Sequence, residues 1–157
     1  SQEICDTLSD LDPSNKEYYK ENLATFTEQL NNLDNEFKTQ LSNVSNKKIV
    51  VSHEAYSYLC SAYGLEQTSI DGISADSEPS PAKMKEIADY IKANNVKYIF
   101  FEELVSPKIA QSLADETGVQ LLALNPFEGL EQEDIDNGAD YISVMEENLK
   151  NLVTALK

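Results

Sequence analysis

The chain of 157 residues has no tryptophan, one histidine and only two cysteines. Cys5 and Cys60 are too few and too far apart for a disulfide framework or a zinc finger. We expect Cys60, which lies inside an apolar helix pattern, to be a small core residue. No apolar run approaches the roughly 20 residues that a helix needs to cross a bilayer. Residues 1–20 lack the charged and apolar regions of an export signal, so we expect neither a signal nor an anchor here.

Basic residues are also scarce. Twelve basic residues against 28 acidic residues give a formal net charge of −16. A field of this sign repels nucleic acids and anionic lipids and attracts cations. The charge therefore excludes DNA and RNA as partners, and it is compatible with a solvated surface or with the capture of cations.

The first part of the chain is predicted to form a long helix. Asp12 can cap its start, and Pro13 suits its first helical position. At roughly 1.5 Å per residue this helix would run about 45 Å. Its single apolar stripe is typical of a bundle helix or of a strut along which other elements lie. The residues of the stripe recur three or four positions apart: Tyr19, Leu23, Phe26, Leu30, Leu33, Phe37, Leu41 and Val44.

From residue 47 onward, short apolar runs alternate with amphipathic helices, which is typical of βαβ units and a parallel sheet. The predicted fold class is α/β, with a long N-terminal helix followed by a doubly wound four-stranded parallel sheet with flanking helices. We place the domains at residues 1–46 and 47–157. The serine of a Ser-Pro pair is expected to cap each of two helices, at Ser80 and at Ser106. Strands are expected at 48–52, 67–73, 96–101 and 119–124, and helices at 54–64, 80–95, 106–118 and 140–156.

Ligands of such sheets bind beyond the carboxyl ends of the strands. His53 can be a metal ligand there or a residue that only caps a helix, and its position leaves both open. A tight zinc site needs three or four protein ligands, so one histidine with scattered carboxylates supplies only part of one. We expect no enzyme, because the chain has no Gly-rich phosphate loop, no Gly-x-Ser-x-Gly elbow and no cysteine after a strand. The polar residues that follow the predicted strands are Ser52, His53, Asp71, Glu102, Glu103 and Asn125.

Four stretches of the chain follow one another in a recognisable order: "DPSNKEYYKENLATFTEQLNNLDNEFK", "VVSHEAYSYLCSAYGL", "EPSPAKMKEIADYIKANNVKYIFFEELVSPKIAQSLADETG" and "LNPFEGL" with "DYISVMEENLKNL". This order of motifs resembles the metal-binding solute-binding lipoproteins of bacterial zinc and manganese ABC transporters, also known as the adhesin lipoprotein or cluster A-I family. The resemblance covers essentially all 157 residues. It implies that residues 1–46 contain the backbone helix that joins the family's two lobes, and that residues 47–157 are its C-terminal lobe.

The resemblance implies a metal site. His53 matches the third ligand position, where zinc-type members carry histidine and several manganese-type members carry glutamate. This favours Zn²⁺ over Mn²⁺, because imidazole suits zinc and oxygen-rich sets suit manganese. Asn125 matches the fourth position, where many members have aspartate; because an amide oxygen is neutral, either water or Asn125 would complete the shell. Glu102 matches a recurring glutamate that is expected to support the ligands rather than bind the metal.

The resemblance also implies a function. The parent protein would be an extracytoplasmic, membrane-anchored lipoprotein that captures zinc between two lobes and delivers it to an ABC permease. Its first two ligands, both histidines, are expected from an N-terminal lobe missing here, so this chain alone should bind zinc weakly or not at all. The exposed helix stripe predicts a homodimer. Two alternatives stay open: a self-sufficient, non-catalytic α/β interaction or adhesion domain without a metal site, and a metal bridged between two copies through His53.

Overall fold

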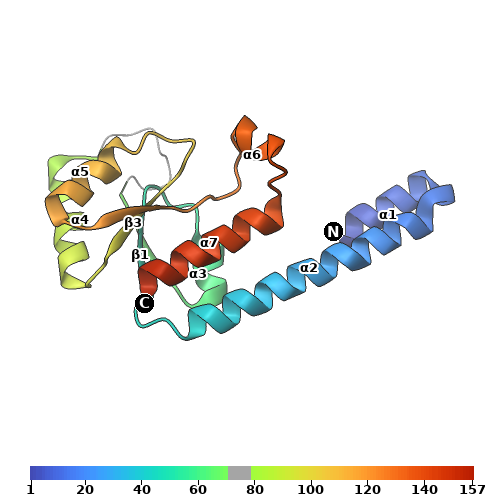
Figure 1. The fold of residues 1–157 in the computed structure, drawn as a ribbon, viewed down its shortest axis with the longest axis horizontal. Helices are drawn as coiled ribbons and strands as arrows, with labels where there is room; N and C mark the ends of the chain where they lie inside the picture. Colours follow the sequence, from blue (N-terminus) through green and yellow to red (C-terminus); the bar gives the residue numbers. More distant parts are fainter. Residues whose placement is uncertain (71–78) are drawn as a thin grey trace. The chain divides into compact units, whose positions relative to one another are not determined.

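The computed structural model of the chain describes residues 1–70 and 79–157 (Figure 1). It forms two compact units, residues 1–37 and residues 38–157, which are described separately. The division that the sequence predicts, between residues 46 and 47, stays a prediction. Within the described parts of the chain, no helix is long and apolar enough to cross a membrane.

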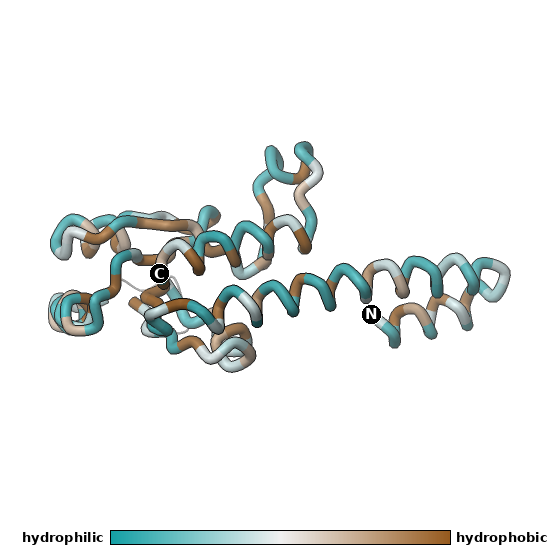
Figure 2. The backbone as a smooth tube through the Cα atoms, turned by 60° about the horizontal axis from the view of Figure 1, so that its bottom comes forward, coloured by the Kyte–Doolittle hydropathy of each residue, from teal (hydrophilic) through white to brown (hydrophobic). Residues whose placement is uncertain are grey.

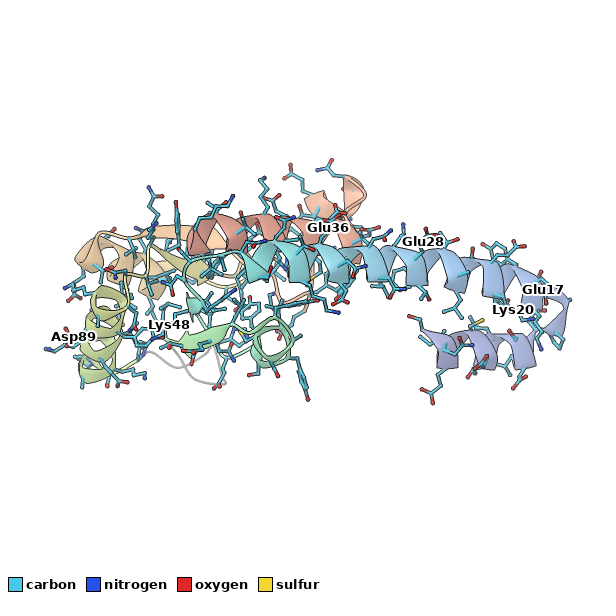
Figure 3. The ribbon with its side chains drawn as sticks, turned by 90° about the horizontal axis from the view of Figure 1, so that it is seen from below. Glu17, Lys20, Glu28, Glu36, Lys48 and Asp89 are labelled. Carbon is cyan, nitrogen blue, oxygen red and sulfur yellow. The ribbon has the colours of Figure 1, made fainter. Side chains whose placement is uncertain are left out.

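The N-terminal unit is built from helix α1 (Gln2–Leu11), the 3-10 turn η1 (Pro13–Asn15) and the first part of helix α2 (Lys16–Ser42), which continues into the second unit. Figure 2 shows that hydrophobic positions recur at intervals along α2, as expected for a helix with one apolar stripe. On its solvent side Glu17 pairs with Lys20 at 2.8 Å (Figure 3). The exposure of side chains changes along the predicted apolar stripe. Phe26 is exposed, whereas the last four residues of the stripe are buried: Leu33, Phe37, Leu41 and Val44.

The start of the long helix differs from the prediction. A 3-10 turn precedes α2, and Asp12 makes no side-chain cap to the backbone of that turn. Its carboxylate instead accepts hydrogen bonds from the side chains of Asn15 (2.7 Å), Ser14 (2.6 Å) and Tyr19 (3.0 Å). Short polar side chains compete with backbone groups in this way at helix starts. These bonds lower the pKa of Asp12 from 3.8 to about 2.

The C-terminal unit contains a four-stranded parallel sheet in the order β2-β1-β3-β4, which confirms the predicted fold class. Because the chain runs from β1 outward to β2 and then crosses over to β3, the strand order reverses between β1 and β3. Ligands of doubly wound sheets bind at such a switch point. Residues 71–73 of the second predicted strand lie outside the described residues. The strands are β1 (Lys48–Val51), β2 (Glu66–Ser69), β3 (Tyr98–Phe101) and β4 (Gln120–Ala123).

In the part of the chain that the structure describes, five helices follow the strands or lie between them. Ser80 caps α4 as predicted, because its hydroxyl accepts from the Lys83 N–H group at 3.2 Å. The prediction that Ser106 caps the next helix is wrong: α5 begins at Lys108, and the Pro107 carbonyl accepts its first helical bond. Helix α6 was not predicted, because its acidic sequence QEDID has no apolar stripe. The helices are α3 (Ser57–Tyr63), α4 (Pro81–Ala93), α5 (Lys108–Thr117), α6 (Gln132–Asp136) and α7 (Tyr141–Leu156).

Helices cover both faces of the sheet. Figure 1 shows α4 and α5 on one side of the strands and α3 and α7 on the other. Val50 and Ile99 pack with α4 and α5 in one core cluster. Because side chains alternate along a strand, the buried Val51 and Phe100 point to the opposite face. The residues at the carboxyl ends of the strands, called the rim below, therefore follow strands that are packed on both faces.

Both cysteines are free thiols. Cys60 in α3 is buried, as predicted, and burial raises the pKa of its thiol to about 11. It therefore stays protonated at neutral pH and packs as a small apolar residue. Cys5 in α1 is also buried.

Candidate metal centre

The register of the sheet brings His53 and Glu102 together at the switch point. Val51 of β1 is paired with Phe100 of β3, so residues 53 and 102 face each other two positions further along. Ser52 continues this pairing, since its N–H group donates to the Phe100 carbonyl at 3.1 Å. The meeting of the two side chains thus follows from the alignment of two buried strands.

The imidazole of His53 is held by the carboxylate of Glu102. His53 Nδ1 contacts Glu102 Oε1, both side chains are buried, and neither atom has a hydrogen-bond partner elsewhere among the described residues. When Nδ1 donates to this carboxylate and the ring carries no second proton, the lone pair of the imidazole lies on Nε2. Carboxylates orient metal-binding histidines in this manner.

Burial raises the pKa of Glu102 above the ordinary value of a glutamate, and the nearby Glu128 carboxylate acts in the same direction. The His53 imidazole opposes both effects by stabilising the charged carboxylate. The carboxylate is therefore costly to bury alone, and the histidine is the partner that makes its burial tolerable.

The second imidazole nitrogen of His53, Nε2, faces Glu128, a residue that the sequence pattern did not predict. Glu128, in the loop after β4, places Oε1 3.9 Å from His53 Nε2, and its side chain is 68% exposed. Two ligand atoms bound tetrahedrally to one zinc ion at roughly 2.0–2.1 Å lie about 3.4 Å apart. The observed separation of 3.9 Å exceeds this value by about half an ångström. The signal in the sequence is a carboxylate three residues after Asn125, not directly after the predicted strand.

Asn125 lies in the same loop, but its amide oxygen is already engaged. The Phe127 N–H group donates to Asn125 Oδ1 at 2.8 Å. This bond closes a tight turn in which Phe127 has a positive φ of 61°. The backbone of Asn125 is paired on both sides with the side chain of Asn148, at 2.8 and 2.7 Å. Asn125 thus shapes the loop that carries Glu128.

The remaining rim residues take other positions. Glu103 is exposed, and with Glu102, Asn125 and Glu128 it borders a small cavity of about 60 Å³. Asp71 lies outside the described residues. Among residues 1–70 and 79–157, no three His, Cys, Asp or Glu side chains form a group that could hold a metal ion. The described rim therefore offers an oriented imidazole and nearby carboxylates, but not a closed set of ligands.

Tyr56 joins the two loops of the site, and it too was not predicted. Its hydroxyl donates to the Leu124 carbonyl at 2.5 Å, linking the segment after β1 to the end of β4. Burial raises the pKa of Tyr56, and the Glu102 and Glu128 carboxylates add to this effect. The phenol is therefore a permanent hydrogen-bond donor at neutral pH.

A long helix precedes a doubly wound parallel sheet that carries an imidazole and carboxylates at its switch point, an arrangement found in solute-binding proteins. The family profile described as "Zinc-uptake complex component A periplasmic" (ZnuA) matches residues 1–155. The chain therefore belongs to the ZnuA family, which confirms the resemblance found in the sequence.

Three relatives show how the chain compares with known proteins. It is 44% identical over 151 residues to the zinc-binding lipoprotein AdcA of Streptococcus pneumoniae (strain ATCC BAA-255 / R6), covering 96% of the chain and 30% of AdcA. It is 41% identical over 145 residues to the high-affinity zinc uptake system protein ZnuA of Bacillus subtilis (strain 168), covering 92% of the chain and 46% of that protein. The crystal structure of the Zn(II)-bound ZnuA-like domain of S. pneumoniae AdcA superposes with a TM-score of 0.83 and 43% identity, over 98% of the chain and 57% of that domain.

The chain thus spans less than half the length of these two curated relatives. The superposition extends over nearly the whole chain, so the N-terminal helices and the α/β unit both have counterparts in the AdcA domain. This agreement confirms the fold class at the level of a solved structure.

Proposed function

We propose that the chain is the backbone helix and C-terminal lobe of an extracytoplasmic zinc receptor that delivers its ion to an ABC permease. The observation that carries the proposal is the His53 imidazole, held by buried Glu102 through Nδ1 and presenting Nε2 to the open rim. The zinc-binding relatives support it, as does the family description of a zinc-uptake component. In this role the protein binds and releases an ion and catalyses no reaction.

His53 is the main ligand of this lobe in the proposal. Zn²⁺ fits an imidazole nitrogen better than Mn²⁺ does, so we propose zinc as the cargo and manganese as the second choice. Glu128 is the strongest candidate for an oxygen ligand, because it is the exposed carboxylate nearest to His53 Nε2 in the described rim. Asn125 remains a candidate for the fourth position through a free lone pair of its amide oxygen, and Glu102 orients His53 without binding the ion.

The rest of the site would come from elsewhere in the parent protein. Both curated relatives are more than twice as long as the part that this chain matches, which leaves room for a second lobe. We propose that this lobe supplies two further histidines and that the parent is a lipoprotein held outside the cytoplasm. A second copy of the chain can also meet the exposed apolar side of α1 and α2, giving a homodimer when the other lobe is absent.

Calorimetric titration of Zn²⁺ into the chain at neutral pH tests the ligand assignment. We expect weak binding that His53→Ala abolishes, because a site with one histidine lacks the chelation that several ligands provide. Glu54→Gln, which changes the exposed neighbouring residue, should leave binding unchanged. Tight stoichiometric binding by the monomer that persists in His53→Ala would overturn the assignment. Sedimentation with and without Zn²⁺ separates this proposal from a metal bridged between two copies.

Family membership argues against the alternative of a domain that only mediates adhesion. That alternative predicts no zinc-dependent rise in melting temperature and only a modest effect of His53→Ala. A zinc-dependent rise in melting temperature that disappears in His53→Ala would exclude it.

A further inference from the structure

Asn148, in helix α7, is a polar side chain buried in the core, and its two shortest hydrogen bonds both join it to the backbone of one residue in the loop after β4. Its exposed fraction is 3%. Oδ1 accepts from the Asn125 N–H group at 2.8 Å, and Nδ2 donates to the Asn125 carbonyl at 2.7 Å. The second Nδ2 contact is with Met145 Sδ at 3.5 Å. A buried amide is costly unless it is paired, so this side chain is specialised for the backbone of Asn125.

The backbone of Asn125 needs such a partner because of its place in the sheet. β4 is an edge strand, and Leu124 makes the last bond to β3, its N–H group donating to the Phe101 carbonyl at 2.9 Å. One residue later the neighbouring strand has ended. The Asn148 side-chain amide takes the place of β3 and forms two hydrogen bonds with the backbone of Asn125, as a neighbouring strand would.

The position of Glu128 depends on the residues between it and Asn125. The Asn125 side chain accepts from the Phe127 N–H group, and Phe127 adopts a left-handed backbone conformation with a φ of 61°. L-residues adopt this conformation at an energetic cost, so the surrounding contacts must hold it. A second contact from α7 helps, because the rings of Phe127 and Tyr141 meet edge to face at 5.2 Å.

We propose that Asn148 is a positioning residue for metal binding. Its amide fixes the backbone of Asn125, the Asn125 side chain then fixes the turn at Phe127, and that turn holds Glu128 beside His53 Nε2. The inference rests on the proposed function, in which His53 and Glu128 bind the ion. It assigns to α7 a part in the site although no residue of α7 touches the metal.

Cobalt(II) titration of the full chain, followed by the visible absorption of the bound ion, tests the proposal. Asn148→Leu removes all its hydrogen bonds, and Asn148→Asp keeps the acceptor for the Asn125 N–H group but loses the donor. We expect both variants to weaken Co²⁺ binding about tenfold, the usual scale for groups that support a metal ligand. Asn151→Leu is the matched control. Asn151 lies one turn further along α7 and donates to the Ala123 carbonyl at 3.1 Å, outside the loop; its loss should change binding less than about twofold.

A double-mutant cycle separates positioning from a general loss of stability. If Asn148 acts through Glu128, Asn148→Asp should weaken Co²⁺ binding no further in a Glu128→Gln background. The inference is overturned if Asn148→Asp binds Co²⁺ as the unmodified chain does, if it is no weaker than Asn151→Leu, or if its effect is undiminished in Glu128→Gln. Failure of the proposed function looks different: Co²⁺ binding would then survive His53→Ala.

Discussion

Glu102 contacts one imidazole nitrogen of His53 and leaves the other open to the rim of the sheet. The two residues come from neighbouring parallel strands, and the paired register of those strands brings them face to face. A histidine that could rotate freely would be a poor ligand for a weak, partly assembled site. The buried carboxylate removes that freedom before any ion arrives.

Replacing Glu102 should therefore weaken metal binding without removing a ligand. We expect Glu102→Ala to reduce Co²⁺ or Zn²⁺ affinity by about 10-fold to 100-fold, and Glu102→Gln by less, because the glutamine oxygen still accepts from Nδ1. Glu103→Gln is the control, since it removes the same charge from the next, exposed residue. Calorimetry on the three variants checks the order, and equal losses in Glu102→Ala and Glu103→Gln would contradict it.

The hydroxyl of Tyr56 should contribute to stability through its bond to the Leu124 carbonyl. Tyr56→Phe leaves that carbonyl without this donor, so the free energy of unfolding should fall by about 1–2 kcal/mol. Urea unfolding measures the change. Tyr58→Phe removes the hydroxyl of a tyrosine that is 94% exposed and should have almost no effect. A similar loss in both variants would show that the buried hydrogen bond is not the cause.

The N-terminal helix pair should lose stability in acid through Asp12. Its folded pKa lies near 2, below the ordinary value of 3.8, so it stabilises the folded unit when ionised. This contribution is fully present above about pH 4 and is lost as the pH falls toward 2. Helix content measured by circular dichroism should therefore fall less between pH 4 and pH 2 in Asp12→Asn than in the unmodified chain. Asp10→Asn, an exposed acidic residue of α1, should follow the unmodified chain; identical curves for all three proteins would refute the prediction.

The apolar side of the helix pair should promote association. A groove of about 290 Å³ opens on α1 and α2, and Ile4 and Leu8 in its lining are exposed to solvent. Light scattering coupled to size exclusion should show dimers at high concentration, because exposed apolar surface of this kind drives contacts. Ile4→Lys combined with Leu8→Lys should restore the monomer, whereas Tyr58→Lys, on α3, should not. A strict monomer at every concentration would contradict the prediction.

Much of the fold was predictable because its signals are local. The apolar periods marked the strands and the long helices, and Ser80 with Pro81 marked the start of α4. Two errors concern the starts of helices. Asp12 binds three side chains instead of capping a helix, and the helix expected at Ser106 starts after Pro107.

The site was only partly predictable for a different reason. His53 and Glu102 directly follow adjacent strands, so the strand-end rule found both. Glu128 reaches the rim only because the turn at Phe127 redirects the chain, and a positive φ at a phenylalanine has no local sequence signal. Asn148 is 23 residues from the backbone that it binds, and an asparagine in a helix gives no indication of such a partner.

Within the turn after β4, Asn125 Oδ1 accepts from the Phe127 N–H group. An aspartate carboxylate offers an oxygen at the same place, and both residue types favour such turns. An asparagine at this position therefore gives the bend without the negative charge that an aspartate would add to the rim. The Oδ1 atom of residue 125 thus determines the shape of the loop, and the other terminal atom of the same side chain determines the charge that it adds to the rim. Exchanging the amide nitrogen of residue 125 for an oxygen therefore changes the charge of the rim, and with it the attraction for cations, but keeps the acceptor of the turn that precedes Glu128.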